Sequence, residues 1–300
     1  MSFYPMLPIV LYFLIVFRAT SIDPVVIQTS SNHTNVPIHL HFNNINGYEM
    51  ASIKGGEAID LTYIKNLITD DEARQLVTIC DHRNGWVMSP QKDVDNGIGD
   101  FRKNDARSSS SCPLIWPMLY LPRYDELKEA GKMTEELEKE LNFTWLLTRK
   151  FASLFEISAD RFEPFQLVRY EIGQQYKSHH DHGDYYGLSD AHRSTTLLIF
   201  LSNVENAGGE TSFPALNITV EPRQGSGIVW NNIRNIDDSN VVQNADGGVE
   251  FNNRILLEAV HEGLPLRSRA YDDEITIKYA MNVWIRENEI INLDKEAYKT

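Results

Sequence analysis

The residues best suited to metal chemistry lie near the middle of the chain, where His179 and Asp181 are two positions apart. On a β-strand, residues i and i+2 project from the same face, so an imidazole and a carboxylate can reach one point together. A third ligand far along the chain, His261, would complete a set of two histidines and one carboxylate. Such a set binds one face of an Fe(II) ion and leaves the opposite face open for a co-substrate and O2.

Ordered sequence blocks accompany these residues. The blocks are Tyr170–Asp181, Arg193–Leu201, Gly208–Pro214, Pro222–Gly227, His261–Leu266 and Lys278–Arg286. In this order they resemble the catalytic domain of the prolyl 4-hydroxylases, which are iron- and 2-oxoglutarate-dependent dioxygenases. Upstream, Arg107-Ser108-Ser109 resembles the Arg-Thr-Ser strand of that family. The resemblance implies an α+β fold in which a double-stranded β-helix, or jelly roll, carries packed N-terminal helices. Strand counting alone gives a sandwich or jelly roll but not this topology.

The resemblance also chooses between two candidate metal pairs. A second His-x-Asp pair begins at His182, and spacing alone leaves both pairs open. In the family, the ligand histidine comes three residues after the second tyrosine of a Tyr-x-x-Gly-Gln-x-Tyr motif, here Tyr176. His179 and Asp181 are therefore the expected ligands. We expect His180 and His182 to be exposed loop or strand residues.

Other residues are assigned to 2-oxoglutarate by the resemblance. Lys278 is expected to bind the remote carboxylate, because a buried lysine opposite a bound carboxylate is paired. Tyr170 and Thr196 match family positions whose hydroxyl groups can donate hydrogen bonds to 2-oxoglutarate. The interval between His261 and Lys278 is longer than in the family, because it contains the polar stretch Arg267–Glu274. An arginine in that stretch is the alternative partner for the carboxylate.

For the peptide substrate, the resemblance places Tyr176, Arg193 and Trp284 along the groove. Aromatic faces suit a proline ring, which a polyproline strand presents with little ordering cost. The implied reaction hydroxylates prolyl C4 in a collagen-like or other Pro-rich polypeptide, consumes O2 and 2-oxoglutarate, and releases succinate and CO2. L-ascorbate would restore oxidised iron. Two alternatives remain, which are a dioxygenase of the same fold acting on another residue or a small molecule, and a non-catalytic jelly-roll binding module.

Charge and composition exclude one class of partner. The chain has 300 residues, enough for one large domain, and a formal net charge of −14 at pH 7. Nucleic-acid binding is not expected, because no basic stripe is present to neutralise phosphates. The acidic excess is interpreted as a contribution to solubility.

The N-terminus predicts entry into the secretory pathway. The apolar stretch Met6–Phe17 is short for a membrane span and precedes small residues, which is typical of a signal peptide over residues 1–21. A signal-anchor stays open, because no Lys or Arg precedes the stretch. Sequons at Asn32, Asn142 and Asn217 agree with lumenal exposure. We expect residence in the endoplasmic reticulum lumen, with a partner subunit as one means of retention.

The two cysteines, Cys80 and Cys112, admit two states. In an oxidising lumen they would form a disulfide that closes a loop long enough to stabilise the fold. Two buried free thiols are the alternative, since the sequence does not show whether the side chains approach each other.

Composition shifts divide the chain into segments. Residues 22–59 are polar and are expected to be a linker, and residues 291–300 a tail. The dioxygenase domain is expected over residues 60–290, with the catalytic jelly roll at about 165–287.

Within the domain, the pattern predicts helices before strands. A capping box at Thr69 opens one helix, a second runs over Met133–Phe155, and the polar stretch Gln91–Asp105 is a loop. Short apolar segments between turn residues predict strands. The predicted strands are Phe165–Tyr170, Thr195–Leu201, Gly227–Trp230, Ile255–Val260 and Ile275–Ile285.

Overall fold

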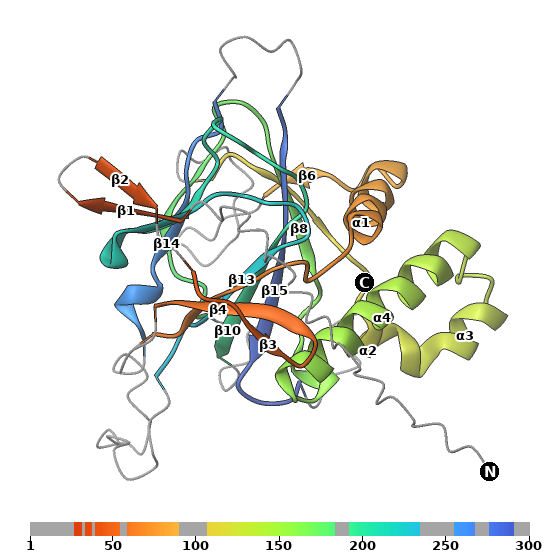
Figure 1. The fold of residues 1–300 in the computed structure, drawn as a ribbon. Helices are drawn as coiled ribbons and strands as arrows, with labels where there is room; N and C mark the ends of the chain where they lie inside the picture. Colours follow the sequence, from red (N-terminus) through yellow and green to blue (C-terminus); the bar gives the residue numbers. More distant parts are fainter. Residues whose placement is uncertain are drawn as a thin grey trace, which may run out of the picture.

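The computed structural model describes the chain in eight stretches. These are residues 27–31, 34–37, 40–54, 59–89, 107–183, 192–234, 255–267 and 276–290. Two antiparallel sheets face each other, and the helices lie on the outer side of one of them (Figure 1). The expected α+β jelly roll with N-terminal helices is confirmed.

The sheets have six and nine strands. In spatial order the six-stranded sheet consists of β2 (Thr34–Pro37), β1 (Ile27–Ser31), β12 (Ile218–Val220), β11 (Thr211–Phe213), β14 (His261–Gly263) and β9 (Tyr176–His179). The nine-stranded sheet consists of β3 (Asn43–Ile45), β4 (Tyr48–Lys54), β5 (Leu61–Ile64), β13 (Gly227–Asn231), β10 (Arg193–Phe200), β15 (Lys278–Arg286), β8 (Gln166–Tyr170), β7 (Ser110–Pro113) and β6 (Val87–Met88). The α-helices are α1 (Asp70–His82), α2 (Pro117–Tyr120), α3 (Tyr124–Glu129) and α4 (Glu135–Phe155).

Strand β10 shows how the nine-stranded sheet is buried on both faces. Leu197 and Ile199 belong to the core between this sheet and helices α1 and α4. Leu198 and Phe200 belong to the core between the two sheets. Because side chains alternate along a strand, a central strand with both faces covered reads as a continuous apolar run. Each such side chain contributes roughly 1.5–3 kcal/mol when fully buried.

The two predicted helices form where local signals place them. The Thr69 hydroxyl accepts a hydrogen bond from the Glu72 amide (3.1 Å), and the Glu72 carboxylate accepts one from the Thr69 amide (2.7 Å). This capping box starts α1 and satisfies amides that the helix leaves unpaired. Helix α4 begins after Thr134, whose hydroxyl accepts from the Leu137 amide. Both helix predictions are confirmed.

Two predictions about the chain's organisation are wrong. Within residues 22–59, expected to be a linker, β1 and β2 extend the six-stranded sheet beside β12, and β3 and β4 extend the other sheet beside β5. Strands at sheet edges need little apolar surface, so a polar composition did not exclude them. The predicted strand Ile255–Val260 contains a 3-10 helix, η6 (Leu257–Ala259); apart from an isolated bridge between Ile255 and Ile233, strand pairing begins at His261. A short apolar run does not distinguish a strand from another buried segment.

Several predicted features lie outside the described residues. These are the leader with Met6–Phe17, Asn32, the loop Gln91–Asp105 and the tail 291–300. The other two sequon asparagines, Asn142 on α4 and Asn217 in a turn before β12, are exposed. Within the ranges given above, no helix is long and apolar enough to cross a membrane.

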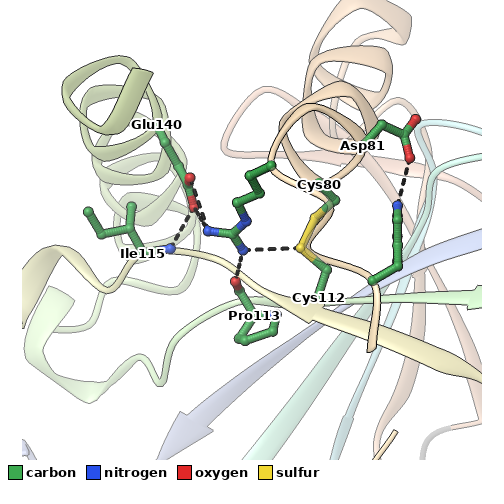
Figure 2. The surroundings of a disulfide bond; sticks show 8 residues. Cys80, Asp81, Cys112, Pro113, Ile115 and Glu140 are labelled. Carbon is green, nitrogen blue, oxygen red and sulfur yellow. Dashed lines mark hydrogen bonds and ion pairs between the residues drawn. A yellow bond between two sulfur atoms is a disulfide. The ribbon is translucent and has the colours of Figure 1, made fainter. Parts of the chain in front are cut away.

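A disulfide joins Cys80 of α1 to Cys112 of β7, with a Cα–Cα distance of 6.2 Å (Figure 2). Beside it, the Arg83 guanidinium donates to both carboxylate oxygens of Glu140 on α4 (2.9 and 3.1 Å) and to the Cys112 sulfur (3.1 Å). Glu140 in turn accepts from the Ile115 amide (2.8 Å). The disulfide and the buried Glu140 carboxylate together connect helices α1 and α4 to strand β7, which pairs with β8. Of the two states left open by the sequence, the structure shows the disulfide.

Replacing both cysteines by serine should lower the free energy of unfolding by about 3 kcal/mol, because the open chain regains the entropy of the loop. Urea unfolding measures the loss. Wild-type protein treated with a reducing agent should lose a similar amount, whereas the double variant should be insensitive to the agent. Two free thiols in peptide maps of non-reduced protein would refute the bond.

Candidate metal centre and its surroundings

Strands β9 and β14 bring two distant histidines together. The strands pair antiparallel with His179 directly opposite His261, and the two ring centroids lie 4.3 Å apart. Asp181 follows two residues after His179. Its Oδ1 lies 3.7 Å from Nε2 of His179, and its Oδ2 lies 3.7 Å from Nε2 of His261. One donor atom from each residue falls within 4.8 Å of the other two. The three residues predicted as ligands therefore converge on one point.

Both histidines are held by backbone carbonyls. Nδ1 of His179 donates to the Lys177 carbonyl, and Nδ1 of His261 donates to the Ala259 carbonyl, each at 2.9 Å. A hydrogen bond at Nδ1 fixes the tautomer and leaves the Nε2 lone pair free for a metal. The Tyr176 ring stacks on the His179 ring at 3.5 Å between centroids. The imidazoles are thus oriented before any ligand binds.

The Asp181 carboxylate is buried and hydrogen-bonded through one oxygen. Its Oδ2 accepts from the Thr196 hydroxyl (2.9 Å) and from the Trp284 indole (3.0 Å). Burial by itself raises the pKa of Asp181, but His261, His179 and Arg193 outweigh it and hold the pKa well below its usual range. The carboxylate is therefore ionised at neutral pH.

This donor set fits a divalent iron ion. Burial lowers the pKa of His179 to about 3, and His261 adds to the shift, so the His179 imidazole is neutral at physiological pH. A neutral imidazole is the form that coordinates metal, and an ionised carboxylate completes the charge. Two histidines and one carboxylate on one side, with both Nδ1 atoms already engaged, form the facial arrangement of non-haem iron sites.

Lys278 opens strand β15 opposite Tyr170 of β8. The lysine is 3% exposed, and its Nζ lies 5.1 Å from the centroid of the Tyr170 ring. Burial lowers the pKa of Lys278 to about 8, although Glu210 opposes the shift. Gly209, at φ +73°, keeps space for the lysine stem, because a Cβ there would lie 3.3 Å from the Lys278 Cδ. A buried cation of this kind is suited to an anionic ligand.

The segment that begins at Arg107 lies close to the metal donors. The sequence of this segment resembles a strand of the family, but no function was assigned to it. The Arg107 guanidinium lies over the Tyr176 ring, 4.6 Å from its centroid, and Nε donates to the Ser109 hydroxyl (3.0 Å). Burial raises the pKa of Tyr170, and Arg107 and a hydrogen bond with Ser109 partly offset this rise. Arg107 therefore lies against Tyr176, and Ser109 lies against Tyr170, the two tyrosines that the sequence assigned to the site.

Arg193 and Trp284, predicted to line the peptide groove, are buried beside the metal donors. The Arg193 guanidinium lies 3.8 Å from the Trp284 ring centroid and donates two hydrogen bonds to Glu163 (2.9 and 2.7 Å). Glu163 also accepts from Nε of Arg286 (3.0 Å). This network supports the indole that donates to Asp181. Glu163 carried no sequence signal, because its partners lie on distant strands.

The alternative residues lie elsewhere. His180 is exposed and His182 is half-buried, and their rings contact each other at 4.3 Å between centroids. Neither belongs to the donor cluster described above. Of the two arginines considered as alternatives to Lys278, Arg267 is exposed and Arg269 lies outside the described residues.

The chain is similar to several known proteins. Residues 165–286 match the family described as the 2OG-Fe(II) oxygenase superfamily. Prolyl 4-hydroxylase 13 of Arabidopsis thaliana is 36% identical over an alignment of 104 residues, and the match covers 29% of this chain and 38% of that protein. Prolyl 4-hydroxylase subunit alpha-1 of Gallus gallus is 27% identical over an alignment of 121 residues, and that match covers 35% of this chain and 23% of that protein. The chain spans less than half the length of these curated relatives.

Among solved structures, the viral collagen prolyl hydroxylase of Paramecium Bursaria Chlorella virus-1 is 21% identical, with a TM-score of 0.45. The comparison covers 75% of this chain and 95% of that one. A prolyl-4-hydroxylase of Pseudomonas putida is 16% identical, with a TM-score of 0.42, and the comparison covers 75% and 92% of the two chains.

Changing any one of His179, Asp181 and His261 to alanine should abolish divalent-metal binding and turnover, because each change removes a donor atom. Circular dichroism should show that the fold is retained. His182→Ala and Asp184→Ala are the matched controls and should keep both metal binding and turnover. Loss of metal binding in these controls, with His179→Ala intact, would show that the wrong pair was assigned.

Lys278→Ala should raise KM for 2-oxoglutarate at least tenfold, because the remote carboxylate loses a charged partner in a buried setting. In the wild type, kcat/KM for 2-oxoglutarate should fall as the pH rises through about 8, where Lys278 loses its proton. The alanine variant should lose this pH dependence. Parallel measurements on Arg267→Ala and Arg269→Ala serve as controls, and a normal KM in the lysine variant would refute the assignment.

Proposed function

We propose that this chain, whose residues 165–286 match the 2OG-Fe(II) oxygenase superfamily, is an oxygenase that hydroxylates peptidyl proline at C4 in a collagen-like or other Pro-rich polypeptide. The convergence of His179, Asp181 and His261 carries the oxygenase part of this proposal. Similarity to curated prolyl 4-hydroxylases supports the choice of proline. The reaction would consume O2 and 2-oxoglutarate and release succinate and CO2.

Iron and 2-oxoglutarate, when bound, supply the oxidising power for attack on an unactivated C–H bond. The protein's own contribution is to bind and orient them. Nε2 of His179, Nε2 of His261 and the Asp181 carboxylate would hold the iron. Lys278 would bind the remote carboxylate of 2-oxoglutarate. The Tyr170 hydroxyl would lie near the bound 2-oxoglutarate, because Tyr170 pairs with Lys278 across β8 and β15.

Apolar and aromatic walls around the donors limit the access of water. Trp230 presents its ring to His261 at 4.8 Å between centroids, and Phe213 packs on both, at 5.2 Å from Trp230 and 5.8 Å from His261. Tyr176 covers one face of His179. Excluding water strengthens the electrostatic contacts at the site and protects reactive species from side reactions.

Tyr176 is the best-placed residue for a peptide. Its ring is half-buried between His179 and the Arg107 guanidinium, so a proline bound beside it would lie close to the metal donors. Arg193 and Trp284 are both buried, so they would influence the bound peptide through the residues that cover them and not by direct contact. A different residue or a small molecule remains the second candidate substrate. The preserved donor set disfavours a purely structural binding module.

We also propose that the enzyme resides in the endoplasmic reticulum lumen. L-ascorbate would keep the iron reduced there, and a partner subunit would be a means of retention. Support comes from the signal-like leader and from the Cys80–Cys112 bond, since disulfides persist in oxidising compartments. The exposed positions of Asn142 and Asn217 are compatible with glycosylation there.

The test uses purified protein with Fe(II), ascorbate and 2-oxoglutarate. A Pro-Pro-Gly repeat peptide should stimulate succinate formation and gain the mass of one oxygen atom per hydroxylation. A peptide with alanine in place of proline should do neither, and Asp181→Ala enzyme should be inactive with both. Succinate formation that no peptide stimulates would point to a small-molecule substrate. If the protein binds metal but forms no succinate under any condition, the proposed oxygenase activity is excluded.

A further inference from the structure

A buried amide lies behind the metal donors and contacts none of them directly. Asn232 follows β13, is 1% exposed, and donates from Nδ2 to the Thr196 hydroxyl oxygen at 2.9 Å. The Thr196 hydroxyl donates to Oδ2 of Asp181, also at 2.9 Å. Two hydrogen bonds in series thus connect the asparagine to the carboxylate.

The chemistry of the groups fixes the direction of both bonds. An ionised carboxylate only accepts hydrogen bonds, so the single hydroxyl hydrogen of Thr196 points to Asp181. The Thr196 oxygen must then accept from its other neighbour, which requires Nδ2 of Asn232 and not Oδ1 on that side. Thr196 therefore has no hydrogen left for 2-oxoglutarate, and its hydroxyl acts on Asp181 instead.

The other end of the Asn232 amide, Oδ1, is buried and makes no hydrogen bond within the described residues. Leaving a buried carbonyl oxygen unpaired destabilises the fold, whereas an apolar side chain of similar size would not have this cost. The backbone is already fixed, because the Asn232 amide donates to Ser194 (2.8 Å) and its carbonyl accepts from Leu256 (3.1 Å).

The same carboxylate oxygen receives a second, independent donor. Nε1 of Trp284 reaches Oδ2 of Asp181 at 3.0 Å. With both donors on Oδ2, the carboxylate plane is fixed and Oδ1 is directed toward His179, 3.7 Å from its Nε2. Partners of metal-binding carboxylates that fix their orientation in this way contribute to metal affinity.

We propose that Asn232 is a positioning residue of the metal centre. Its amide holds the Thr196 hydroxyl in the one orientation that donates to Asp181, so that Oδ1 of Asp181 faces the metal before the metal binds. The inference rests on the proposed metal centre but not on the identity of the substrate. Asn232 would thus affect metal affinity without touching the metal, 2-oxoglutarate or the peptide.

The experiment measures binding of Mn2+ to metal-free protein by titration calorimetry, with Mn2+ as a stand-in for Fe(II) that resists oxidation. Asn232→Leu removes the donor at similar volume and should weaken Mn2+ binding about tenfold. The matched control is Asn231→Leu at the adjacent position, the last residue of β13. Oδ1 of Asn231 accepts from the Asp60 backbone amide (2.7 Å), and its Nδ2 donates to the Ile233 carbonyl (3.2 Å) and not to Thr196, so Asn231→Leu should leave the Kd for Mn2+ unchanged.

A double-mutant cycle tests whether Asn232 acts through Thr196. Thr196→Val should weaken Mn2+ binding by a similar factor, and combining it with Asn232→Leu should cause no further loss. Thr196→Ser, which keeps the hydroxyl, should retain most of the wild-type affinity. Trp284→Phe should weaken binding further in either background, because it removes the independent donor.

Three results would overturn the inference. Unchanged Mn2+ affinity in folded Asn232→Leu would remove it, as would fully additive losses in the cycle with Thr196→Val. Wild-type protein that does not bind Mn2+ would refute the metal centre itself and this inference with it. Thermal unfolding monitors the fold of each variant. If Asn232→Leu does not fold, Asn232→Ala takes its place in the cycle, with the same tenfold loss expected and the same results overturning the inference.

Discussion

The candidate site depends on one long-range pairing, that of β9 with β14. It places His179 directly opposite His261 and so brings two distant histidines together with Asp181. A shift of one residue in this register would turn one histidine to the other side of the sheet. Burial of one face against the core between the two sheets sets the register, because Phe213 of the neighbouring strand β11 and Trp230 of β13 in the facing sheet pack on His261.

Charges at the site are buried, and the structure offsets that burial locally. Asp181 stays ionised because His261, His179 and Arg193, together with the hydrogen bond from Trp284, outweigh desolvation and keep its pKa low. Lys278 has weaker compensation, which is why its pKa falls to about 8. A carboxylate whose hydrogen bonds are already made, and a buried lysine whose charge is only partly compensated, suit a metal donor and an anion receptor respectively.

The helical layer is connected to the site through β7. The Cys80–Cys112 bond anchors one end of this strand to α1, and the strand continues from the segment that carries Arg107 and Ser109. Arg107 in turn covers Tyr176, which covers His179. The N-terminal half therefore contributes to the surroundings of the metal donors as well as to the core, although the superfamily match begins only at residue 165.

The sequence alone determined features that depend on neighbouring residues. The capping box at Thr69 predicted the start of α1, because capping hydrogen bonds join residues three apart. The two-residue spacing of His179 and Asp181 predicted a shared face, and the ordered blocks predicted His261 as the third member. Only the tertiary structure decided what depends on packing between distant segments. The polar strands β1 to β4, which lie at or next to the edges of the sheets, are stabilised by pairing that their own composition does not reveal. Likewise, the roles of Asn232 and Glu163 come from hydrogen bonds to residues on other strands, and no local pattern specifies such partners.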